Sequence, residues 1–304
     1  MLKKKYKMAI CYDFDGTLSP GNMQEYGFFY GLGDLAKHFW KESTQIAKEN
    51  NADPILAYMK HMIDKAAESR IPTTKKAFHD YGKTVKFYNG VDTWFERINE
   101  YGKQHNISIE HYIVSSGLKE MIEGTKIKKE FKKIYACSFI YDHNSVAKWP
   151  AVAVNYTTKT QFLFRINKGI NDDSDNKKIN DFIPEKDRPV PFKRMVYIGD
   201  GATDIPCMKL VKDKGGFSIA VYPNTPPKKR TEANRLIKDG RVHYSIEADY
   251  SADGHMESLI KAIIRKVVSD LDLNELGSMK KTTGKKNGDH EGAHVGKNSS
   301  TFNF

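Results

Sequence analysis

Apolar positions along the chain follow two different spacings, and segments of the two kinds alternate. Short apolar runs typical of buried strands occur at residues 7–13, 111–114, 134–140, 151–156, 194–198, 218–222 and 242–244. Apolar residues at helical spacing lie between most of them, at residues 91–101, 119–125, 157–166 and 256–268. Strands that alternate with helices are typical of parallel β-α-β units, so we predict an α/β fold with a doubly wound parallel sheet.

A purely helical stretch interrupts this alternation after the first strand. Apolar residues recur at helical spacing from about Asn22 to Lys86. Asp53 followed by Pro54 is a typical helix start, because proline suits the first helical position. The stretch therefore predicts an insert made of several helices.

These patterns divide the chain into a core, an insert and a tail. The last stretch is rich in Gly, Lys, Ser, Thr and Asn and has no apolar period, which is typical of a disordered terminus. We predict an α/β core that carries the active site over residues 1–19 and 89–277, a helical domain over residues 20–88 and a disordered tail over residues 278–304.

The composition is that of a globular protein inside the cell. Of the 304 residues, 39% are hydrophobic and 29% are charged, and no apolar run approaches the roughly 18 residues that a membrane span needs. The basic N-terminus is followed by only a short apolar stretch before Asp13, which is too little for a signal peptide. The three cysteines have no CxxC spacing, so neither a disulfide framework nor a zinc site is expected. We predict a cytoplasmic protein that does not bind a membrane.

The net charge of +11 favours anionic ligands. Five of the lysines lie in the predicted tail, and the rest of the excess is scattered. No basic patch with interleaved aromatic residues and no nucleic-acid-binding module is present, so no nucleic-acid partner is expected. Nothing in the sequence indicates the oligomeric state.

Two acidic side chains follow the first predicted strand directly. Asp13 and Asp15 are two residues apart on an extended chain, so their carboxylates point the same way and repel each other unless a cation lies between them. Mg²⁺ is the natural cation for such oxygen ligands. Gly16 allows a tight turn, and the backbone amides from Gly16 and Thr17 onward can face an oxyanion. An Asx turn is the simpler alternative for this motif.

Polar residues also follow later predicted strands. Ser115 and Ser116, before Gly117, offer a hydroxyl and free amides at a strand end, which can bind a phosphate oxygen. Asp200 and Asp204 bring two more carboxylates, about one helical turn apart, after another buried strand. Because the carboxyl ends of parallel strands meet at one edge of a sheet, these groups are expected to converge.

A lone lysine is usually a surface charge, but in this setting a lysine could neutralise the carboxylates and a phosphate together, and two are candidates. Lys159 lies at the start of a predicted helix between the serine and aspartate motifs. Lys168 lies at the end of the same helix, where an interaction with the helix dipole is the more usual role.

These pieces, in this order, resemble the four motifs of the haloacid dehalogenase (HAD) superfamily of phosphohydrolases. The motifs are Asp13–Thr17, Ser115, Lys159 and Gly199–Asp204, and the match extends from about Met8 to Val268. The helical insert is similar to a C1-type cap, and the serine and aspartate motifs look most like the phosphoserine phosphatase-like branch. Members of that branch carry an acidic residue shortly after the first motif, to grip the substrate amine. Here the matching position is Asn22, with Glu25 nearby.

The resemblance implies a role for each motif residue. Asp13 would be the nucleophile that forms an aspartyl-phosphate, and Asp15 would be the general acid and base. Mg²⁺ would be held by the Asp13 carboxylate, the Asp15 backbone carbonyl and Asp200. Asp204 would contribute through a bound water or by supporting the ligands without contacting the ion. The phosphoryl oxygens would be bound by Gly16, Thr17, Ser115, Ser116 and Lys159.

The predicted activity is therefore the Mg²⁺-dependent hydrolysis of a small phosphate monoester, with a phosphorylated metabolite as partner. Residues Ser19 to Glu25 are the candidates for substrate specificity. The aromatic residues of the insert are interpreted as the core of the cap: Phe28, Phe29, Tyr30, Phe39 and Trp40.

Two other functions remain open from the sequence. A phosphomutase or phosphotransferase would use the same aspartyl-phosphate but pass the phosphoryl group to another hydroxyl. A non-enzymatic basic binding protein would use the positive charge alone, and it would bind its partner in a strongly salt-dependent way.

Overall fold

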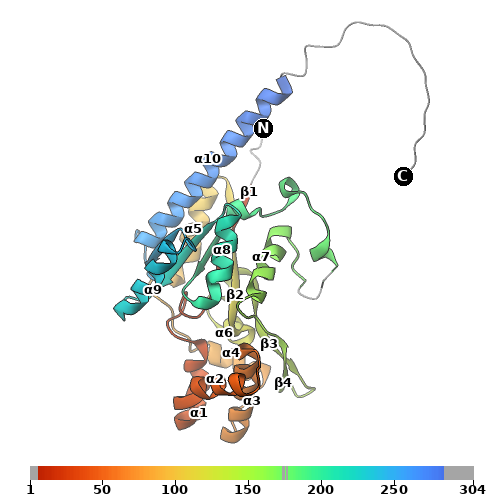
Figure 1. The fold of residues 1–304 in the computed structure, drawn as a ribbon, viewed down its shortest axis with the longest axis vertical. Helices are drawn as coiled ribbons and strands as arrows, with labels where there is room; N and C mark the ends of the chain where they lie inside the picture. The colour runs from red at the N-terminus through yellow and green to blue at the C-terminus, as the bar shows by residue number, and fades with distance from the viewer. Residues whose placement is uncertain (1–5, 173–174, 176, 284–304) are drawn as a thin grey trace, which may run out of the picture.

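A seven-stranded sheet forms the centre of the molecule (Figure 1). The computed structural model describes residues 6–172, 175 and 177–283. The strands lie in the order β4-β3-β2-β1-β5-β6-β7, and all neighbours pair in parallel except β3 and β4. Their bounds are β1 Tyr6–Tyr12, β2 Ile107–Leu118, β3 Phe131–Tyr141, β4 Ala147–Val152, β5 Met195–Gly199, β6 Phe217–Tyr222 and β7 Tyr244–Glu247. The predicted fold class is confirmed.

Helices cover the sheet in two layers because the chain winds outward from β1 in both directions. The outer elements are α5 Val91–Gln104, α7 Thr158–Lys168, α8 Ile205–Asp213, α9 Pro227–Lys238 and α10 His255–Thr283. Helix α5 packs on β2 and α10, whereas α7 packs on α8, which covers β5 and β6. Right-handed crossovers that run in opposite directions place these two groups on opposite faces. β1 is accordingly covered on both sides, and Met8 to Tyr12 are fully buried.

A group of helices lies at the carboxyl ends of the strands, and we call residues 22–82 of this group the cap (Figure 1). Its α-helices are α1 Gly27–Leu32, α2 Phe39–Glu49, α3 Pro54–Ser69 and α4 Lys75–Gly82. Asp53 starts α3 as predicted, since its Oδ1 accepts hydrogen bonds from the backbone N of Ile55 (2.8 Å) and Leu56 (3.1 Å). The cap also packs on the core through α4 and α6 Lys119–Gly124.

Three element boundaries differ from the predicted ones. β2 continues to Leu118 with an irregular register after Val114, so the serine motif belongs to the strand end itself. β4 begins at Ala147, earlier than expected, and pairs with β3 as a hairpin. Helix α10 continues to Thr283, past the expected start of the tail at residue 278. Residues 284–304 lie outside the described residues.

No helix in the described part of the chain combines the length and the apolar character that crossing a membrane requires.

Candidate active site

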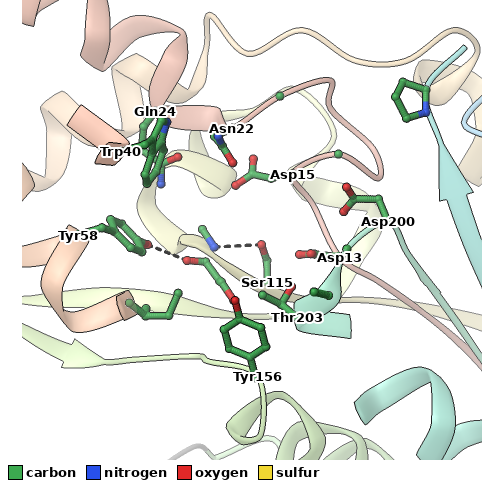
Figure 2. A pocket seen from close by; sticks show the side chains of 18 of the residues that line it. Asp13, Asp15, Asn22, Gln24, Trp40, Tyr58, Ser115, Tyr156, Asp200 and Thr203 are labelled. Carbon is green, nitrogen blue, oxygen red and sulfur yellow. Dashed lines mark hydrogen bonds between the residues drawn. The ribbon is translucent and has the colours of Figure 1, made fainter. Parts of the chain in front are cut away.

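A cavity of about 490 Å³ opens between the carboxyl ends of the strands and the cap (Figure 2). The core contributes the loop after β1, the end of β2, the loop after β5 and the loop before α7, and the cap contributes the opposite wall. Its lining includes Asp13, Asp15, Gly16, Ser115, Ser116 and Asp200. The volume is in the range of small-molecule sites.

A buried lysine links two of the predicted aspartates. Lys159, in the first turn of α7, is fully buried, and its Nζ lies 2.9 Å from Asp13 Oδ2 and 2.7 Å from Asp204 Oδ1. Tyr197 donates a second hydrogen bond to Asp204 Oδ1 (2.7 Å), and the backbone N of Gly201 donates one to Asp204 Oδ2 (3.2 Å). Both carboxylate oxygens of Asp204 therefore accept hydrogen bonds, and its ion pair with Lys159 positions the lysine next to Asp13.

Three carboxylates approach one another closely enough to share a cation. Asp13, Asp200 and Asp204 each offer an oxygen, and these oxygens all lie within 4.8 Å of one another. Gly16, at φ +70°, makes room for this approach, because a Cβ atom there would lie 2.2 Å from Asp200 Oδ2. A donor set made only of carboxylate oxygens fits a hard divalent cation such as Mg²⁺.

The electrostatics of the cluster point the same way. Burial, and then the charge of Asp204, raises the pKa of Asp13 to about 6 in spite of Lys159. Burial and the charges of Asp204 and Asp13 raise the pKa of Asp200 to about 8. Burial lowers the pKa of Lys159, but Asp13 and Asp204 outweigh it and raise that pKa above its ordinary value. One lysine thus faces three carboxylates, and a cation would relieve the excess of negative charge.

Asp15 lies beside this cluster and is held separately. Its Oδ1 accepts a hydrogen bond from the backbone N of Met23 (2.8 Å), which ties the carboxyl group to the base of the cap. Burial, and then the charge of Asp13, raises the pKa of Asp15 well above its ordinary value. The three-carboxylate cluster does not include the Asp15 side chain. The raised pKa favours the protonated form of this carboxyl group, which also lines the cavity.

The predicted phosphate-binding residues divide between the cavity wall and the interior. Ser115 lines the cavity, and its Oγ accepts a hydrogen bond from the backbone N of Gly117 (3.1 Å). Ser116 also lines it, and its buried Oγ has no hydrogen-bond partner. Gly16 lines the cavity, but Thr17 is fully buried and does not. Lys159, also predicted to bind phosphate, is fully buried and does not line the cavity either, so Gly16, Ser115 and Ser116 are the predicted phosphate-binding residues that do.

The two candidate lysines are clearly separated. Lys168 Nζ donates hydrogen bonds to the backbone oxygens of Ile179 (2.5 Å) and Asp181 (2.7 Å), in the segment after α7. Of the two lysines, only Lys159 contacts the carboxylates of Asp13 and Asp204.

The sequence of the chain matches a known family. The profile of haloacid dehalogenase-like hydrolases matches residues 10–209, which span the aspartate, serine and lysine motifs. The chain belongs to this family. An uncharacterized protein of Borreliella burgdorferi is 30% identical over 278 residues, which cover 83% of this chain and 94% of that protein.

Solved structures of other HAD proteins share the fold. A probable phosphoserine phosphatase from Vibrio cholerae has a TM-score of 0.52 at 13% identity, over 88% of this chain and 67% of that one. A substrate-bound phosphoserine phosphatase has a TM-score of 0.50 at 16% identity, over 80% of this chain and 94% of that one. A HAD family hydrolase of Salmonella enterica serovar Typhi has a TM-score of 0.51 at 17% identity, and this chain covers 66% of its length. The predicted resemblance is therefore confirmed at the level of family and fold.

Several wall residues of this HAD protein were not predicted. Trp40, interpreted from the sequence as cap core, does pack against the core but also lines the cavity, together with Tyr58 of α3. Tyr58 OH also donates a hydrogen bond to the backbone O of Ser116 (2.7 Å), which fastens the cap to the end of β2 (Figure 2). Phe28 and Phe39 are buried as predicted, whereas Tyr30 is 75% exposed. Helical spacing identifies an apolar face but cannot say which of its residues borders a cavity.

Other wall residues come from the loop before α7 and from α9, a helix that was not predicted. Tyr156 precedes α7, and Lys229 lies in the first turn of α9. Neither stands in a recognisable motif. Asn22 and Gln24, by contrast, fall within the segment Ser19 to Glu25 that was predicted to determine specificity, and both line the cavity.

Proposed function

We propose that this HAD protein is a Mg²⁺-dependent phosphatase that hydrolyses a small phosphate monoester through an aspartyl-phosphate on Asp13. The observation that carries the proposal is the convergence of Asp13, Asp200 and Lys159 on one side of a cavity that Asp15 also lines. The family match supports a hydrolase, and the chemistry of the cluster supports phosphoryl transfer.

Each half of the reaction has a residue in place. In the first half, an oxygen of Asp13 attacks the phosphorus, the bond from phosphorus to the leaving oxygen breaks, and Asp15 gives its proton to that oxygen. In the second half, Asp15 takes a proton from water, the resulting hydroxide attacks the phosphorus, and the carboxylate of Asp13 is released with inorganic phosphate. The raised pKa of Asp15 suits a group that starts as an acid.

The remaining residues position the phosphoryl group and balance its charge. Mg²⁺, held by Asp13, Asp200 and the Asp15 backbone carbonyl, would neutralise charge on the phosphoryl oxygens. Ser115 and Ser116 would donate hydrogen bonds to these oxygens, whereas the predicted donor Gly16 N already donates to the backbone O of Ser19 (2.8 Å). Asp204, already bound on both oxygens, would act by holding Lys159 in place. A positioned, charge-matched site of this kind is what phosphoryl transfer requires.

A panel of phosphate monoesters, read as released phosphate, tests the function. We expect Mg²⁺-dependent release of inorganic phosphate from p-nitrophenyl phosphate and from at least one metabolite of the panel. In a single turnover, the phosphate should appear free. Transfer of the phosphoryl group to an added alcohol in place of water would identify the phosphotransferase alternative, and absence of any Mg²⁺-dependent turnover would refute the proposal.

Mg²⁺ binding is expected to strengthen as the pH rises from about 6 to about 8. The carboxylates must lose their protons to bind the ion, and in the metal-free protein the pKa of Asp13 is about 6 and that of Asp200 about 8. Protons therefore compete with Mg²⁺ at the lower pH, and each displaced proton strengthens binding by up to about tenfold per pH unit. Isothermal titration calorimetry of the whole protein at several pH values measures this slope.

A matched pair of variants controls the Mg²⁺ experiment. Asp200→Asn should remove most Mg²⁺ binding, whereas Asp213→Asn, which alters only a surface ion pair with Lys209, should leave it unchanged. Equal binding by both variants, or binding that weakens as the pH rises, would contradict the assignment.

A further inference from the structure

The cap forms one wall of the cavity, and this wall carries amide side chains. A ligand with an ammonium group would need a carboxylate in their place. We call this surface the cap wall and define it as Asn22, Gln24, Trp40, Ile55 and Tyr58. It lies on the far side of Asp15 from the core, as Figure 2 shows for its labelled members. In the proposed reaction this is where the leaving group of the substrate lies.

Gln24 is an unsatisfied polar group in this wall. Its side chain is 2% exposed and lines the cavity, and the amide oxygen Oε1 is buried without a hydrogen-bond partner. A buried acceptor without a donor costs free energy that a ligand can restore by supplying one. The residue therefore points to a ligand with hydrogen-bond donors, such as a hydroxyl group.

Asn22 is held by a carboxylate that stands behind it. Glu25 Oε1 accepts hydrogen bonds from Asn22 Nδ2 (2.6 Å) and from Trp40 Nε1 (3.0 Å). The amide nitrogen of Asn22 is thus engaged, and its oxygen is left as a second acceptor beside Asp15. Glu25 itself is not among the cavity-lining residues, and its carboxylate also accepts a hydrogen bond from the backbone N of Asn22 (3.4 Å), so three N–H groups donate to it.

The charges around the cavity disfavour a cationic leaving group. Among the cap residues that the structure describes, none that lines the cavity is acidic. The core carboxylates Asp13 and Asp200 are committed to Lys159 and to the proposed metal site, and Lys229 adds a positive charge to the same cavity. A desolvated ammonium group with no carboxylate of its own is strongly unfavourable.

We propose that the substrate is the phosphate ester of an uncharged, hydroxyl-bearing alcohol of the sugar or polyol type, and that Gln24 is a specificity-determining residue that accepts a hydrogen bond from one of its hydroxyl groups. The aromatic faces of Trp40 and Tyr58 complete such a site, because they can pack against the C–H surface of a polyol. This inference rests on the proposed phosphatase function.

Two substrate pairs test the inference, each differing in charge at nearly constant size. The first pair is glucose 6-phosphate and glucosamine 6-phosphate, in which one hydroxyl becomes an ammonium group. The second pair is 2-hydroxyethyl phosphate and phosphoethanolamine. At a slightly acidic pH, where the amines are protonated, we expect kcat/KM to favour the hydroxyl-bearing member of at least one pair by about tenfold or more.

Two variants of Gln24 separate specificity from catalysis. Gln24→Met keeps the length of the side chain but removes the acceptor, so kcat/KM for the preferred hydroxyl-bearing ester should fall about tenfold. Gln24→Glu adds a carboxylate and should shift the preference toward the ammonium-bearing member. The decisive quantity is the ratio of kcat/KM for the hydroxyl-bearing ester to kcat/KM for p-nitrophenyl phosphate, whose leaving group offers no hydroxyl donor; this ratio should fall in Gln24→Met, and circular dichroism with urea denaturation shows that both variants are folded.

Distinct results would overturn each level of the argument. Equal rates within both pairs, a preference for the ammonium member, or no turnover of either hydroxyl-bearing ester by an enzyme active on p-nitrophenyl phosphate would refute the polyol assignment alone. A uniform loss on all substrates in Gln24→Met would refute its role in specificity. Inactivity of the wild-type protein on p-nitrophenyl phosphate with Mg²⁺ would refute the phosphatase function, and the substrate assignment with it.

Discussion

Asp13→Asn is expected to lower kcat for p-nitrophenyl phosphate by roughly 10⁴-fold or more, since in the proposed mechanism Asp13 is the nucleophile and its loss removes the reaction path itself. The amide keeps the shape of the side chain but cannot form the acyl phosphate. It also removes one negative charge from the cluster with Asp200 and Asp204. The measurement is phosphate release by the purified variant at saturating Mg²⁺.

The same substitution should not destabilise the metal-free protein. The pKa of Asp13 is raised to about 6 from an ordinary value of 3.8, so the folded state disfavours the ionised carboxylate. A raised carboxyl pKa lowers stability as the pH rises above the ordinary value, and a neutral amide avoids that loss. Urea denaturation in EDTA should therefore give Asp13→Asn a free energy of unfolding equal to or above that of the wild type at pH 8, with a smaller difference at pH 5.

Asp34→Asn is the matched control for this variant. Asp34 is 92% exposed and pairs with Lys37 on the surface of the cap, so its loss should change neither turnover nor stability measurably. Turnover by Asp13→Asn above about one hundredth of the wild-type rate would remove Asp13 from the role of nucleophile.

The core of this site was predictable because the physics that builds it is local. Asp13 and Asp200 each follow an apolar run that is buried on both faces, and such runs form the central strands β1 and β5. Parallel strands bring their carboxyl ends to one edge, so the side chains that follow them converge without further information. The position of Lys159 needed one more step, because a lysine is usually a surface residue and only its place between the motifs singled it out.

The cap wall was not predictable from the same kind of reasoning. Trp40 and Phe39 are neighbours in the sequence and both are aromatic, yet Phe39 is fully buried and Trp40 borders the cavity. That difference depends on how α2 is rotated against α3 and on the hydrogen bond from Trp40 to Glu25, and neither is encoded in the apolar period. Tyr58 is likewise one of several buried residues of α3. Only the tertiary arrangement shows that its hydroxyl group reaches β2.

The end of α10 was missed for a different reason. The apolar period weakens after Val268, and Leu273 and Leu276 are 65% and 62% exposed. The helix nevertheless continues to Thr283, since residues such as leucine, glutamate and lysine favour helix without burial. The apolar period therefore indicates which part of a helix packs against the core, but it does not indicate where the helix ends.

Lys159→Met is the variant that should affect both stability and activity. In the described part of the chain, Lys159 Nζ is the only side-chain amino group that forms ion pairs with Asp13 and Asp204. The Lys159 side chain is fully buried. Removing one member of a buried ion pair leaves an unpaired charge, which costs roughly 3–5 kcal/mol in the free energy of unfolding. The active site should fail as well, because Asp13 and the phosphoryl group both lose their neighbouring positive charge.

The loss of stability should depend on pH in a defined direction. The pKa of Lys159 is raised, so the lysine stays charged throughout the neutral range and the pH dependence comes from its partner. Asp13, with a pKa of about 6, is mostly protonated at pH 5 and ionised at pH 8. Lys159→Met should therefore be more destabilised at pH 8 than at pH 5, as measured by urea denaturation in EDTA.

Lys168→Met, in the same helix, separates this effect from the general cost of losing a lysine. Lys168 donates to two backbone oxygens and contacts none of the active-site carboxylates, so its loss should cost about 1 kcal/mol and leave turnover unchanged. If the two variants lost similar stability and kept similar activity, Lys159 would be a packing residue. A large loss of stability for Lys159→Met alone, greater at the higher pH, would show that Lys159 stabilises the charged form of Asp13, the proposed nucleophile.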